Sequence, residues 1–235
     1  MFNPKPTVQV LTVAGRPACY VIDDALLEPE RWVDHAVAHA GEFTDAPHNA
    51  FPGPELRMPD AVSARLDGFF GLHVRRRFDA RRTLSMYSRL SLATRTPAEL
   101  EPRQWLCHVD RMNSTPGQCI AASVLYLFRD EALGGTGFYR PLRPPAEIGR
   151  LVQDSAAMAR DEFTDRYGIH AGYMSGSNAY FEKILAVPAR WNRLIFYSGM
   201  VFHCSDITAP EKLSRDPLRG RLTLNGFFSC RRNLS

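Results

Sequence analysis

The strongest strand signal in this chain is QCIAASVLYLF, residues 118–128. Its apolar residues follow one another with almost no polar interruption, which is typical of a strand covered on both faces. A glycine-rich turn is predicted shortly after it, at Gly134-Gly135-Thr136-Gly137. The segment therefore predicts a central strand of a sheet that other layers bury from both sides.

Further elements are predicted on either side of this segment. Runs bounded by Gly, Pro or polar clusters predict strands at residues 7–14, 19–22, 83–92, 104–110, 179–187, 193–197, 200–203 and 219–230. Apolar residues at helical spacing predict one helix from Asp24 to about residue 40, where Gly41 stops it. A second helix is expected from a cap at Asp60 to residue 70, and a third from Pro145 to about Tyr167. Residues 43–59 are rich in Pro, Gly and Asn and predict an ordered surface loop.

The order of these elements predicts a mainly β fold with supporting helices (α+β), arranged as a double-sheet β-barrel or jelly roll. We expect a single domain over residues 1–235, because barrels of this length are commonly one domain. Residues 1–80 would supply N-terminal strands and supporting helices, and residues 81–230 the barrel core. The helical insert at about 145–167 is expected either to pack on the barrel or to cover its mouth as a lid.

The composition allows a full apolar core, since apolar residues make up 45% and aromatic residues 11% of the chain. No apolar run approaches the roughly 20 residues that span a bilayer, so no membrane partner is expected. The N-terminus lacks a secretory pattern, and we expect a cytoplasmic protein. The net charge of +4 is mild, and the basic run Arg75-Arg76-Arg77 predicts a solvated helix end instead of a nucleic-acid site.

Three residues carry metal-binding chemistry. His108 and Asp110 are two positions apart, so on one strand they point to the same face, and His203 follows much later in the sequence. Two imidazoles and one carboxylate cover one face of an Fe(II) ion and leave positions open for a chelating cosubstrate and O2. Arg221 and Thr223 add a cation and a hydroxyl that suit a distant carboxylate of that cosubstrate. The pattern indicates an oxygenase, and the alternative is two hydrogen-bonded histidines beside an ordinary carboxylate.

Other reactive residues predict less. Five cysteines are spread over the chain without a Cys-x-x-Cys pair, and we expect reduced thiols. Cys107 and Cys204 each neighbour a candidate ligand, and since strand neighbours point to opposite faces, both are expected to face away from the metal. His35 and His39 lack the glutamate of a His-Glu-x-x-His zinc motif and are expected on a solvated helix flank.

Four segments together resemble the Fe(II)/2-oxoglutarate-dependent oxygenases, in particular their prolyl-hydroxylase-like branch. The first two are an entry strand at residues 20–26 and a strand with a following Gly-Gly turn at residues 123–138. The others are a strand pair that ends at the distal histidine, at residues 193–203, and a final strand with a cosubstrate arginine, at residues 221–224. The resemblance implies a double-stranded β-helix, which is a jelly-roll or cupin-like barrel. It implies an enzyme of the non-haem dioxygenase class, with Fe(II) as its cofactor and 2-oxoglutarate and O2 as its cosubstrates.

The resemblance also implies roles for individual residues. His108, Asp110 and His203 would bind Fe(II), and Arg221 would hold the 5-carboxylate of 2-oxoglutarate with a hydroxyl from Thr223. Arg219 is the alternative cation for that carboxylate. Tyr87 and Tyr126 match tyrosines that hydrogen-bond the cosubstrate in related enzymes. Candidates for substrate contact share strand faces with these residues: Arg89, Ser91 and Asn225.

The reaction that the resemblance implies is hydroxylation of an unactivated carbon with release of succinate and CO2. Asp110 occupies the ligand position that halogenases of the family replace with a small residue, which favours hydroxylation. The substrate class implied is an amino acid, a peptide or a natural-product precursor. Two alternatives remain, a metal-dependent hydrolase or isomerase on a cupin-like barrel and a non-catalytic barrel that acts as a binding module.

Overall fold

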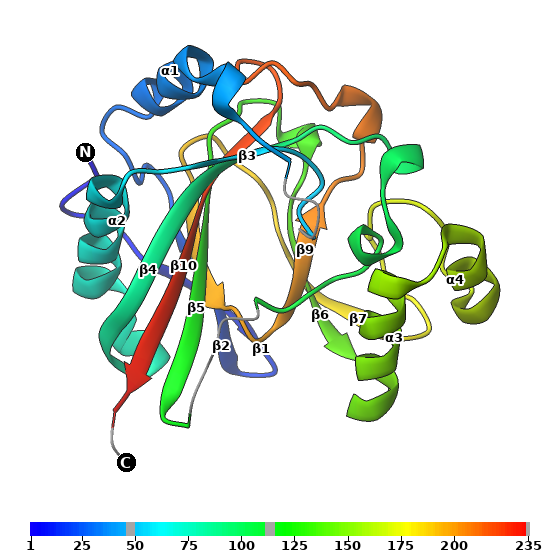
Figure 1. Cartoon of the computed structure of the whole chain (residues 1–235). Coiled ribbons are helices and arrows are strands. Elements are labelled where there is room, and N and C mark those ends of the chain that lie inside the picture. The colour runs from blue at the N-terminus through cyan, green and yellow to red at the C-terminus, as the bar shows by residue number, and fades with distance from the viewer. Residues whose placement is uncertain (46–49, 111–115, 234–235) are drawn as a thin grey trace.

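The structure is a computed structural model that describes residues 1–45, 50–110 and 116–233. Two antiparallel β-sheets face each other, with helices on their outer sides (Figure 1). The large sheet has the strand order β1 (Gln9–Val13), β2 (Arg16–Ile22), β8 (Leu194–Ser198), β5 (Gln118–Tyr126), β10 (Arg221–Arg232), β4 (Ala80–Ala93) and β3 (Glu55–Arg57). The small sheet has the order β7 (Phe181–Val187), β6 (Gly135–Pro141) and β9 (Phe202–Asp206).

The helices fall into long and short groups. The α-helices of the described residues are α1 (Glu30–Ala38), α2 (Asp60–His73), α3 (Pro145–Ala157) and α4 (Arg160–Tyr167). Short 3-10 helices occupy Ala40–Glu42, Arg75–Phe78, Pro97–Glu99, Pro102–Gln104, Glu131–Leu133 and Pro210–Lys212. None of the helices in the described ranges is long and apolar enough to cross a membrane.

The chain alternates between the two sheets as it winds. It passes from β4 in the large sheet to a β-bridge at His108 beside β9, and then returns to the large sheet as β5. It crosses to β6 and β7, returns as β8, crosses again as β9 and ends in β10. This is the winding of a double-stranded β-helix, so the predicted jelly-roll fold is confirmed. The described strands form two open antiparallel sheets and not a closed barrel. Strands β1 and β3 are the edge strands of the large sheet.

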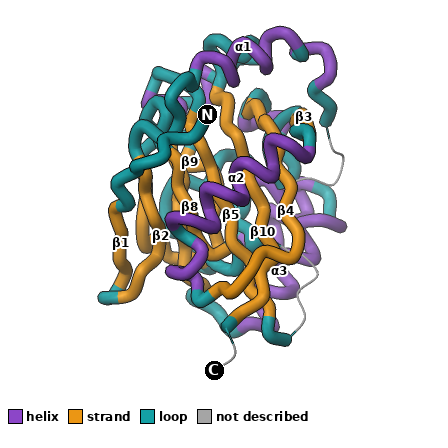
Figure 2. Tube along the Cα trace, turned by 90° about the vertical axis from the view of Figure 1, so that its left-hand side faces the viewer, coloured by secondary structure: helices purple, strands orange, loops and turns teal. Residues whose placement is uncertain are grey.

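Three apolar layers hold the sheets and helices together. Helix α2 lies across the outer face of the large sheet (Figure 2), where Phe70 stacks on Phe228 at 4.4 Å between ring centroids. Between the sheets, Tyr126 and Tyr197 of the large sheet belong to one buried cluster with Phe138 of the small sheet. On the outer face of the small sheet, α3 and α4 bury a third cluster, in which Ile148, Leu151, Phe163, Tyr139 and Phe181 take part.

The strand predicted at residues 118–128 is confirmed as β5, and its apolar run has the expected cause. Ala121 and Leu125 belong to the cluster beneath α2, while Ala122 and Tyr126 belong to the cluster between the sheets. Successive side chains of a strand point to opposite faces, so a strand buried on both faces needs apolar residues at consecutive positions.

Five local predictions were wrong or incomplete. The helix predicted from Asp24 to about residue 40 is shorter, because α1 covers only Glu30–Ala38. The strand predicted at residues 104–110 is reduced to a bridge at His108, because Trp105 and Cys107 instead pack into the cluster under α3 and α4. The single helix predicted at 145–167 is two helices, since the backbone at Met158 is extended. The predicted loop at 43–59, of which residues 46–49 lie outside the described ones, contains strand β3. Helix α2 begins at Asp60, but Pro59 occupies its N-cap position and no side-chain cap forms.

The glycines at 134–137 act differently from the turn that the sequence predicts. Only Gly134 has a positive φ, of 84°, and β6 already begins at Gly135. A Cβ atom at Gly134 would lie 2.1 Å from the carbonyl oxygen of Asp206, and one at Gly135 would lie 1.9 Å from that of Val187. Glycine is required here because neighbouring backbone approaches β6 closely.

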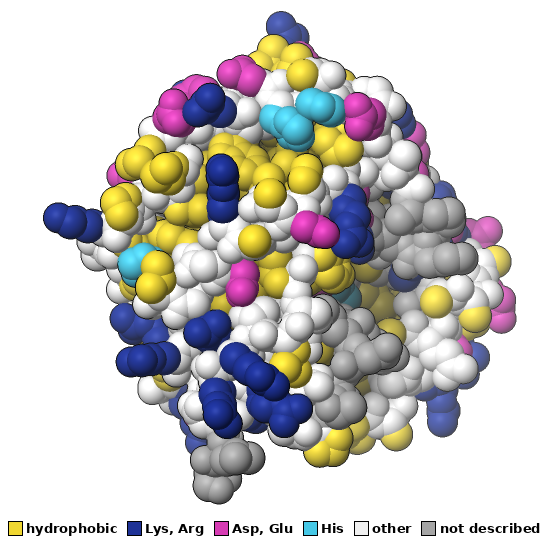
Figure 3. All heavy atoms as spheres, turned by 60° about the vertical axis from the view of Figure 1, so that its left-hand side comes forward, with side chains coloured by type: hydrophobic (Ala, Val, Ile, Leu, Met, Phe, Trp, Pro, Cys, Tyr) yellow, Lys and Arg dark blue, Asp and Glu magenta, His cyan; other side chains and the backbone are white. Residues whose placement is uncertain are grey.

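The basic run and the paired histidines lie on the surface. Arg75, Arg76 and Arg77 form the 3-10 turn after α2, and the side chains of Arg76 and Arg77 are exposed. On the face of the molecule that Figure 3 shows, Lys and Arg side chains gather toward the lower left. His35 and His39 stack on α1 with ring centroids 4.1 Å apart, and no third metal-binding side chain joins them among the described residues.

Candidate metal centre

Backbone hydrogen bonds bring the three candidate ligands to one place. The amide of His108 donates to the carbonyl of His203 at 2.9 Å, and the amide of His203 donates back at 2.8 Å. Two residues on, the amide of Asp110 donates to the carbonyl of Gly199 at 2.7 Å. His108 and Asp110 therefore keep the extended spacing that points both side chains inward, although only one residue of this segment forms a β-bridge.

The ligand atoms form a tight cluster. Asp110 Oδ1 lies 4.0 Å from His108 Nε2, and Asp110 Oδ2 lies 3.6 Å from His203 Nε2. All three ligand atoms lie within 4.8 Å of one another. The separations of 3.6 and 4.0 Å match donors around one metal ion, because ligand bonds of about 2 Å place neighbouring donors roughly 3–4 Å apart.

The hydrogen-bond pattern of the cluster fits a bound cation. The carbonyl of Val201 can only accept, so the 2.8 Å contact with His203 Nδ1 puts the proton on Nδ1 and leaves a lone pair on Nε2. That lone pair faces Asp110 Oδ2, which is buried and has no hydrogen-bond partner among the described residues. Two acceptors that face each other without a proton between them fit a metal ion, and the hydrogen bond from Nδ1 to Val201 holds the ring in the orientation that ligation needs.

The protonation states also fit a metal ion. Burial, together with the neighbouring His203, lowers the pKa of His108 to about 4, and burial lowers the pKa of His203 to about 4. Both imidazoles are therefore neutral at pH 7, as metal ligation requires. Burial raises the pKa of Asp110 to about 6 in the absence of a cation. Two neutral imidazoles and one carboxylate are a donor set that suits Fe(II).

Gly199 makes room for the carboxylate. A Cβ atom at this position would lie 3.0 Å from Asp110 Oδ2 and 2.8 Å from the side chain of Ile120. Any larger residue would push the carboxylate away from the two imidazoles. Sequence inspection did not mark Gly199, because it follows β8 at a place where a glycine is equally typical of a turn.

The three ligands line a cavity of about 320 Å³ between the sheets. The inward face of β10 forms one wall, to which every second residue from Arg221 to Phe227 contributes: Arg221, Thr223, Asn225 and Phe227. Its alternate residues Leu222, Leu224 and Phe228 pack beneath α2. Tyr87 and Arg89 of β4 and Glu55 of β3 also line the cavity. Its volume is that of a small-molecule site.

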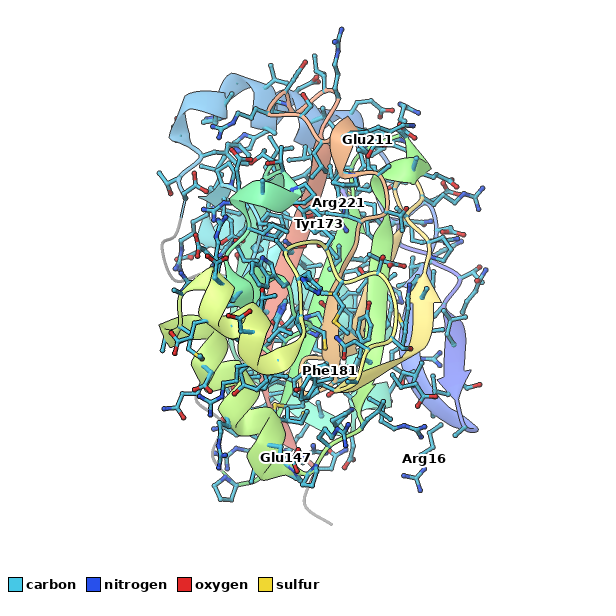
Figure 4. All side chains as sticks on the ribbon, turned by 90° about the vertical axis from the view of Figure 1, so that its right-hand side faces the viewer. Arg16, Glu147, Tyr173, Phe181, Glu211 and Arg221 are labelled. Carbon is cyan, nitrogen blue, oxygen red and sulfur yellow. The ribbon has the colours of Figure 1, made fainter. Side chains whose placement is uncertain are left out.

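Arg221 is a buried cation that forms no ion pair within the described part of the chain. Its side chain is 2% exposed, its Nε donates to the carbonyl of Gly134 at 3.0 Å, and its Nη2 donates to the carbonyl of Gly135 at 2.7 Å. It lies between the sheets near Tyr173 (Figure 4). Burial lowers the pKa of Arg221, and no carboxylate of the described residues forms an ion pair with it. A guanidinium nevertheless stays charged, so this site favours a bound carboxylate.

The other predicted cosubstrate residues lie at different depths. Thr223 lines the cavity two positions from Arg221, and its hydroxyl donates to the carbonyl of Ser91 at 3.4 Å. Tyr87 also lines the cavity. Tyr126 is fully buried behind the cavity wall, and its hydroxyl contacts the hydroxyl of Thr136 at 2.7 Å. Arg219, the alternative cation, has an 85% exposed side chain near Asp216 and does not line the cavity.

Residues outside the predicted set also shape the cavity. Tyr197 packs against the ring of His203 at 4.6 Å, and Thr136 joins the wall beside Arg221. Glu55 enters from a segment that was predicted to be a loop, so sequence reasoning missed it. Cys107 is buried in the cluster under α3 and α4, in agreement with its predicted orientation away from the metal. The thiol of Cys204 donates to the carbonyl of Met174, but Cys204 also lines the cavity.

Helices α3 and α4 support the small sheet from outside. All of their residues are described, and none of them lines the cavity. Their buried residues Ile148, Leu151 and Phe163 pack against the sheet instead. Of the two sequence-based alternatives for residues 145–167, packing on the sheet agrees with this position and a lid over the metal centre does not.

Comparison with known proteins places the chain in a family and supports the fold. The family model described as "Family of unknown function (DUF6445)" matches residues 4–228. None of the curated proteins matches the sequence. The structure is similar to that of HygX from Streptomyces hygroscopicus, which was crystallised with nickel and 2-oxoglutarate, at a TM-score of 0.50 and 12% identity over 91% of this chain and 82% of HygX.

Two further solved structures are similar at lower TM-scores. A prolyl-4-hydroxylase from Pseudomonas putida is 13% identical over 92% of this chain and 94% of its own, with a TM-score of 0.47. An N-substituted L-amino acid dioxygenase from Burkholderia ambifaria is 12% identical over 99% of this chain and 100% of its own, with a TM-score of 0.41. At 12% identity the likeness to HygX bears on the fold alone, and the chemistry has to be argued from the side chains of this chain.

Proposed function

The chain belongs to the DUF6445 family of unknown function, and we propose that it is an Fe(II)- and 2-oxoglutarate-dependent dioxygenase. In this proposal it hydroxylates an unactivated carbon of an amino acid, a peptide or a natural-product precursor and releases succinate and CO2. The observation that carries the proposal is the pairing of two features in one cavity. A His-Asp-His cluster with neutral imidazoles shares its walls with a buried arginine that has no acidic partner among the described residues.

These two features match the two ends of 2-oxoglutarate. His108, Asp110 and His203 would hold Fe(II), which would activate O2, the oxidant of the reaction, with 2-oxoglutarate as the co-reductant. Arg221 holds the far carboxylate through charge-assisted hydrogen bonds, and Thr223 offers a hydroxyl beside it. The carbonyls of Gly134 and Gly135 fix the guanidinium in place before any ligand arrives, which preorganises the site.

Aromatic side chains keep water away from His203, whose side chain is buried. Tyr197 covers the ring of His203 from one side, and Phe138 lies 6.4 Å from the same ring. Asp110 supplies an oxygen ligand at the third protein position, which supports hydroxylation over halogenation. The bond from His203 Nδ1 to Val201 keeps Nε2 unprotonated and oriented toward the cluster.

A hydrolase would need a second acid or base near the metal. Glu55 is the other acidic residue of the cavity wall, but its Oε2 accepts from Arg89 at 2.5 Å and its Oε1 accepts from Ser91 at 2.8 Å. A carboxylate engaged on both oxygens is a poor general base. This arrangement supports the dioxygenase over the hydrolase or isomerase.

The test uses purified protein with Fe(II) and 2-oxoglutarate under anaerobic conditions. We expect a weak visible charge-transfer band, and after O2 is admitted we expect succinate. His108→Ala should abolish both signals, whereas His170→Ala, at an exposed position away from the cavity, should retain them. A folded, iron-loaded protein that gives neither band nor succinate would rule the proposal out.

A further inference from the structure

Two arginines and two aromatic rings meet where β3, β4 and β10 pair. Tyr87, Phe227 and Arg89 line the cavity there, and Arg57 lies beside them at an exposed position. Tyr87 and Phe227 are partners across β4 and β10, and their rings stack with centroids 4.9 Å apart. The guanidinium carbon of Arg89 lies 5.0 Å from the centroid of Tyr87 and 5.7 Å from that of Phe227. The guanidinium carbon of Arg57 lies 5.9 Å from the centroid of Tyr87. The rings therefore form an apolar floor between two cations.

A hydrogen-bonded chain holds Arg89 in position. Its Nη1 donates to Glu55 Oε2, and the other oxygen of Glu55 accepts from the hydroxyl of Ser91. Ser91 in turn accepts from the side-chain amide of Asn225 at 2.9 Å. Glu55 is buried, whereas the side chain of Arg89 is 31% exposed, so the guanidinium is anchored at one edge and open to the cavity at another. Such a planar fork suits a carboxylate.

The charges at this place do not cancel. Arg57 and Arg89 are direct partners across β3 and β4, a pairing that destabilises a sheet unless other charges offset it. Glu55 offsets one of them. The nearest acid to Arg57 is Asp60 at 4.0 Å, and the two side chains are 72% and 97% exposed, so water screens that pair. One positive charge therefore remains in excess beside the apolar floor.

We propose that Arg89, supported by Arg57, binds the carboxylate of the substrate, and that the substrate is a small organic acid. Its carbon skeleton would lie on Tyr87 and Phe227 and reach toward the metal ligands. That the bound acid is the substrate of the metal centre rests on the proposed function. Arg89 lies opposite Asn225, four residues along β10 from Arg221. At about 3.3 Å per residue the two arginines are separated by roughly 13 Å along the strand, which gives the cavity two distinct carboxylate sites.

The test measures binding directly, by saturation-transfer NMR on the full chain loaded with Zn(II) and 2-oxoglutarate. The probes are the proteinogenic L-amino acids, their N-acetyl derivatives and the corresponding amides, so that the carboxylate is removed from otherwise matched molecules. We expect at least one acid that binds while its amide does not. N-acetyl acids that bind would assign recognition to the carboxylate alone, without an ammonium group.

Variants then locate the site. Arg89→Gln should raise the Kd of that acid by about tenfold or more, because a charge-assisted fork is lost. Arg89→Lys keeps a cation beside Glu55 and should give an intermediate Kd. Arg57→Gln, at an exposed position, should raise the Kd by about 2–5-fold. Arg150→Gln on the exposed side of α3 is the matched control and should change nothing.

Failure of this inference differs from failure of the proposed function. If no acid of the panel binds more tightly than its amide, or if Arg89→Gln leaves the Kd unchanged, the carboxylate site at Arg89 is refuted while the charge-transfer band persists. If the band is absent but an Arg89-dependent acid still binds, the proposed function fails and the carboxylate site stands.

Discussion

Replacing Arg221 by methionine separates the cost of this residue to the fold from its benefit to ligand binding. The variant removes the hydrogen bonds to the carbonyls of Gly134 and Gly135, and each unsatisfied buried carbonyl costs about 1–3 kcal/mol. It also removes a buried charge without an acidic partner, whose desolvation costs several kcal/mol. Because the two effects oppose each other, we expect the free energy of unfolding without ligand to change by no more than about 2 kcal/mol.

With 2-oxoglutarate present the two proteins should diverge. A charge-assisted fork to a carboxylate contributes about 1.5–3 kcal/mol, so the Kd should rise by up to about 100-fold. At a 2-oxoglutarate concentration of about 100 times its Kd, the wild-type protein gains about 2.7 kcal/mol of stability. A hundredfold weaker site gains only about 0.4 kcal/mol under the same conditions. For a chain of this size the difference corresponds to about 5–9 °C in Tm.

The assay is thermal unfolding of Zn(II)-loaded protein with and without 2-oxoglutarate. Arg219→Met is the matched control, because Arg219 lies two residues away with an 85% exposed side chain. The control should keep the full rise in Tm. If Arg221→Met keeps it too, or if Arg219→Met loses it, the assignment of Arg221 to the distant carboxylate is wrong.

Three further predictions concern the centre and its surroundings. Asp110→Asn should stabilise the metal-free protein at pH 7–8 by about 1–3 kcal/mol in urea unfolding. Because the pKa of Asp110 is raised to about 6, the wild-type protein loses stability as pH rises through 6. The stability difference between Asp110→Asn and wild type should therefore shrink as pH falls toward 4. A pH-independent difference would contradict this reasoning. Gly199→Ala should lower Zn(II) affinity about tenfold or more by displacing Asp110, as calorimetry can measure, whereas Gly149→Ala, which meets no atom within 4 Å, should not. Tyr126→Phe should change the Kd for 2-oxoglutarate by less than about threefold, because its hydroxyl meets Thr136 behind the cavity wall, and a larger loss in the same titration would return Tyr126 to the cosubstrate site.

The sequence predicted the large sheet better than the connections between the sheets. The apolar run of β5 and the alternation of β10 report burial directly, because strand side chains point to fixed faces. The approach to His108 was predicted as a strand, and the same residue pattern instead buries Trp105 and Cys107 beneath α3 and α4. Competition between two apolar layers for one segment is decided by long-range packing, which a local pattern does not contain.

The candidate site divides in the same way. Spacing along a strand was enough to group His108 with Asp110 and Arg221 with Thr223. Glu55 was not predictable, because a three-residue strand after a Pro-rich loop has no periodicity of its own and exists through pairing with β4. The sequence predicted a turn at Gly134 and Gly135, because glycine is typical both of turns and of places where two backbone segments approach closely.

The buried charges of Asp110 and Arg221 indicate which ligands the cavity binds. Asp110 and Arg221 are both buried in one cavity and do not form an ion pair with each other. Keeping opposite charges apart in a low-dielectric interior is unfavourable unless something lies between them. A divalent cation alone would satisfy Asp110 but leave the cavity strongly positive beside Arg221. A divalent cation together with a dicarboxylate bridges both ends and brings these charges to zero. The same reasoning predicts that the dicarboxylate binds more tightly after the metal than before it, because without the metal its two negative charges are repelled by the unneutralised charge of Asp110.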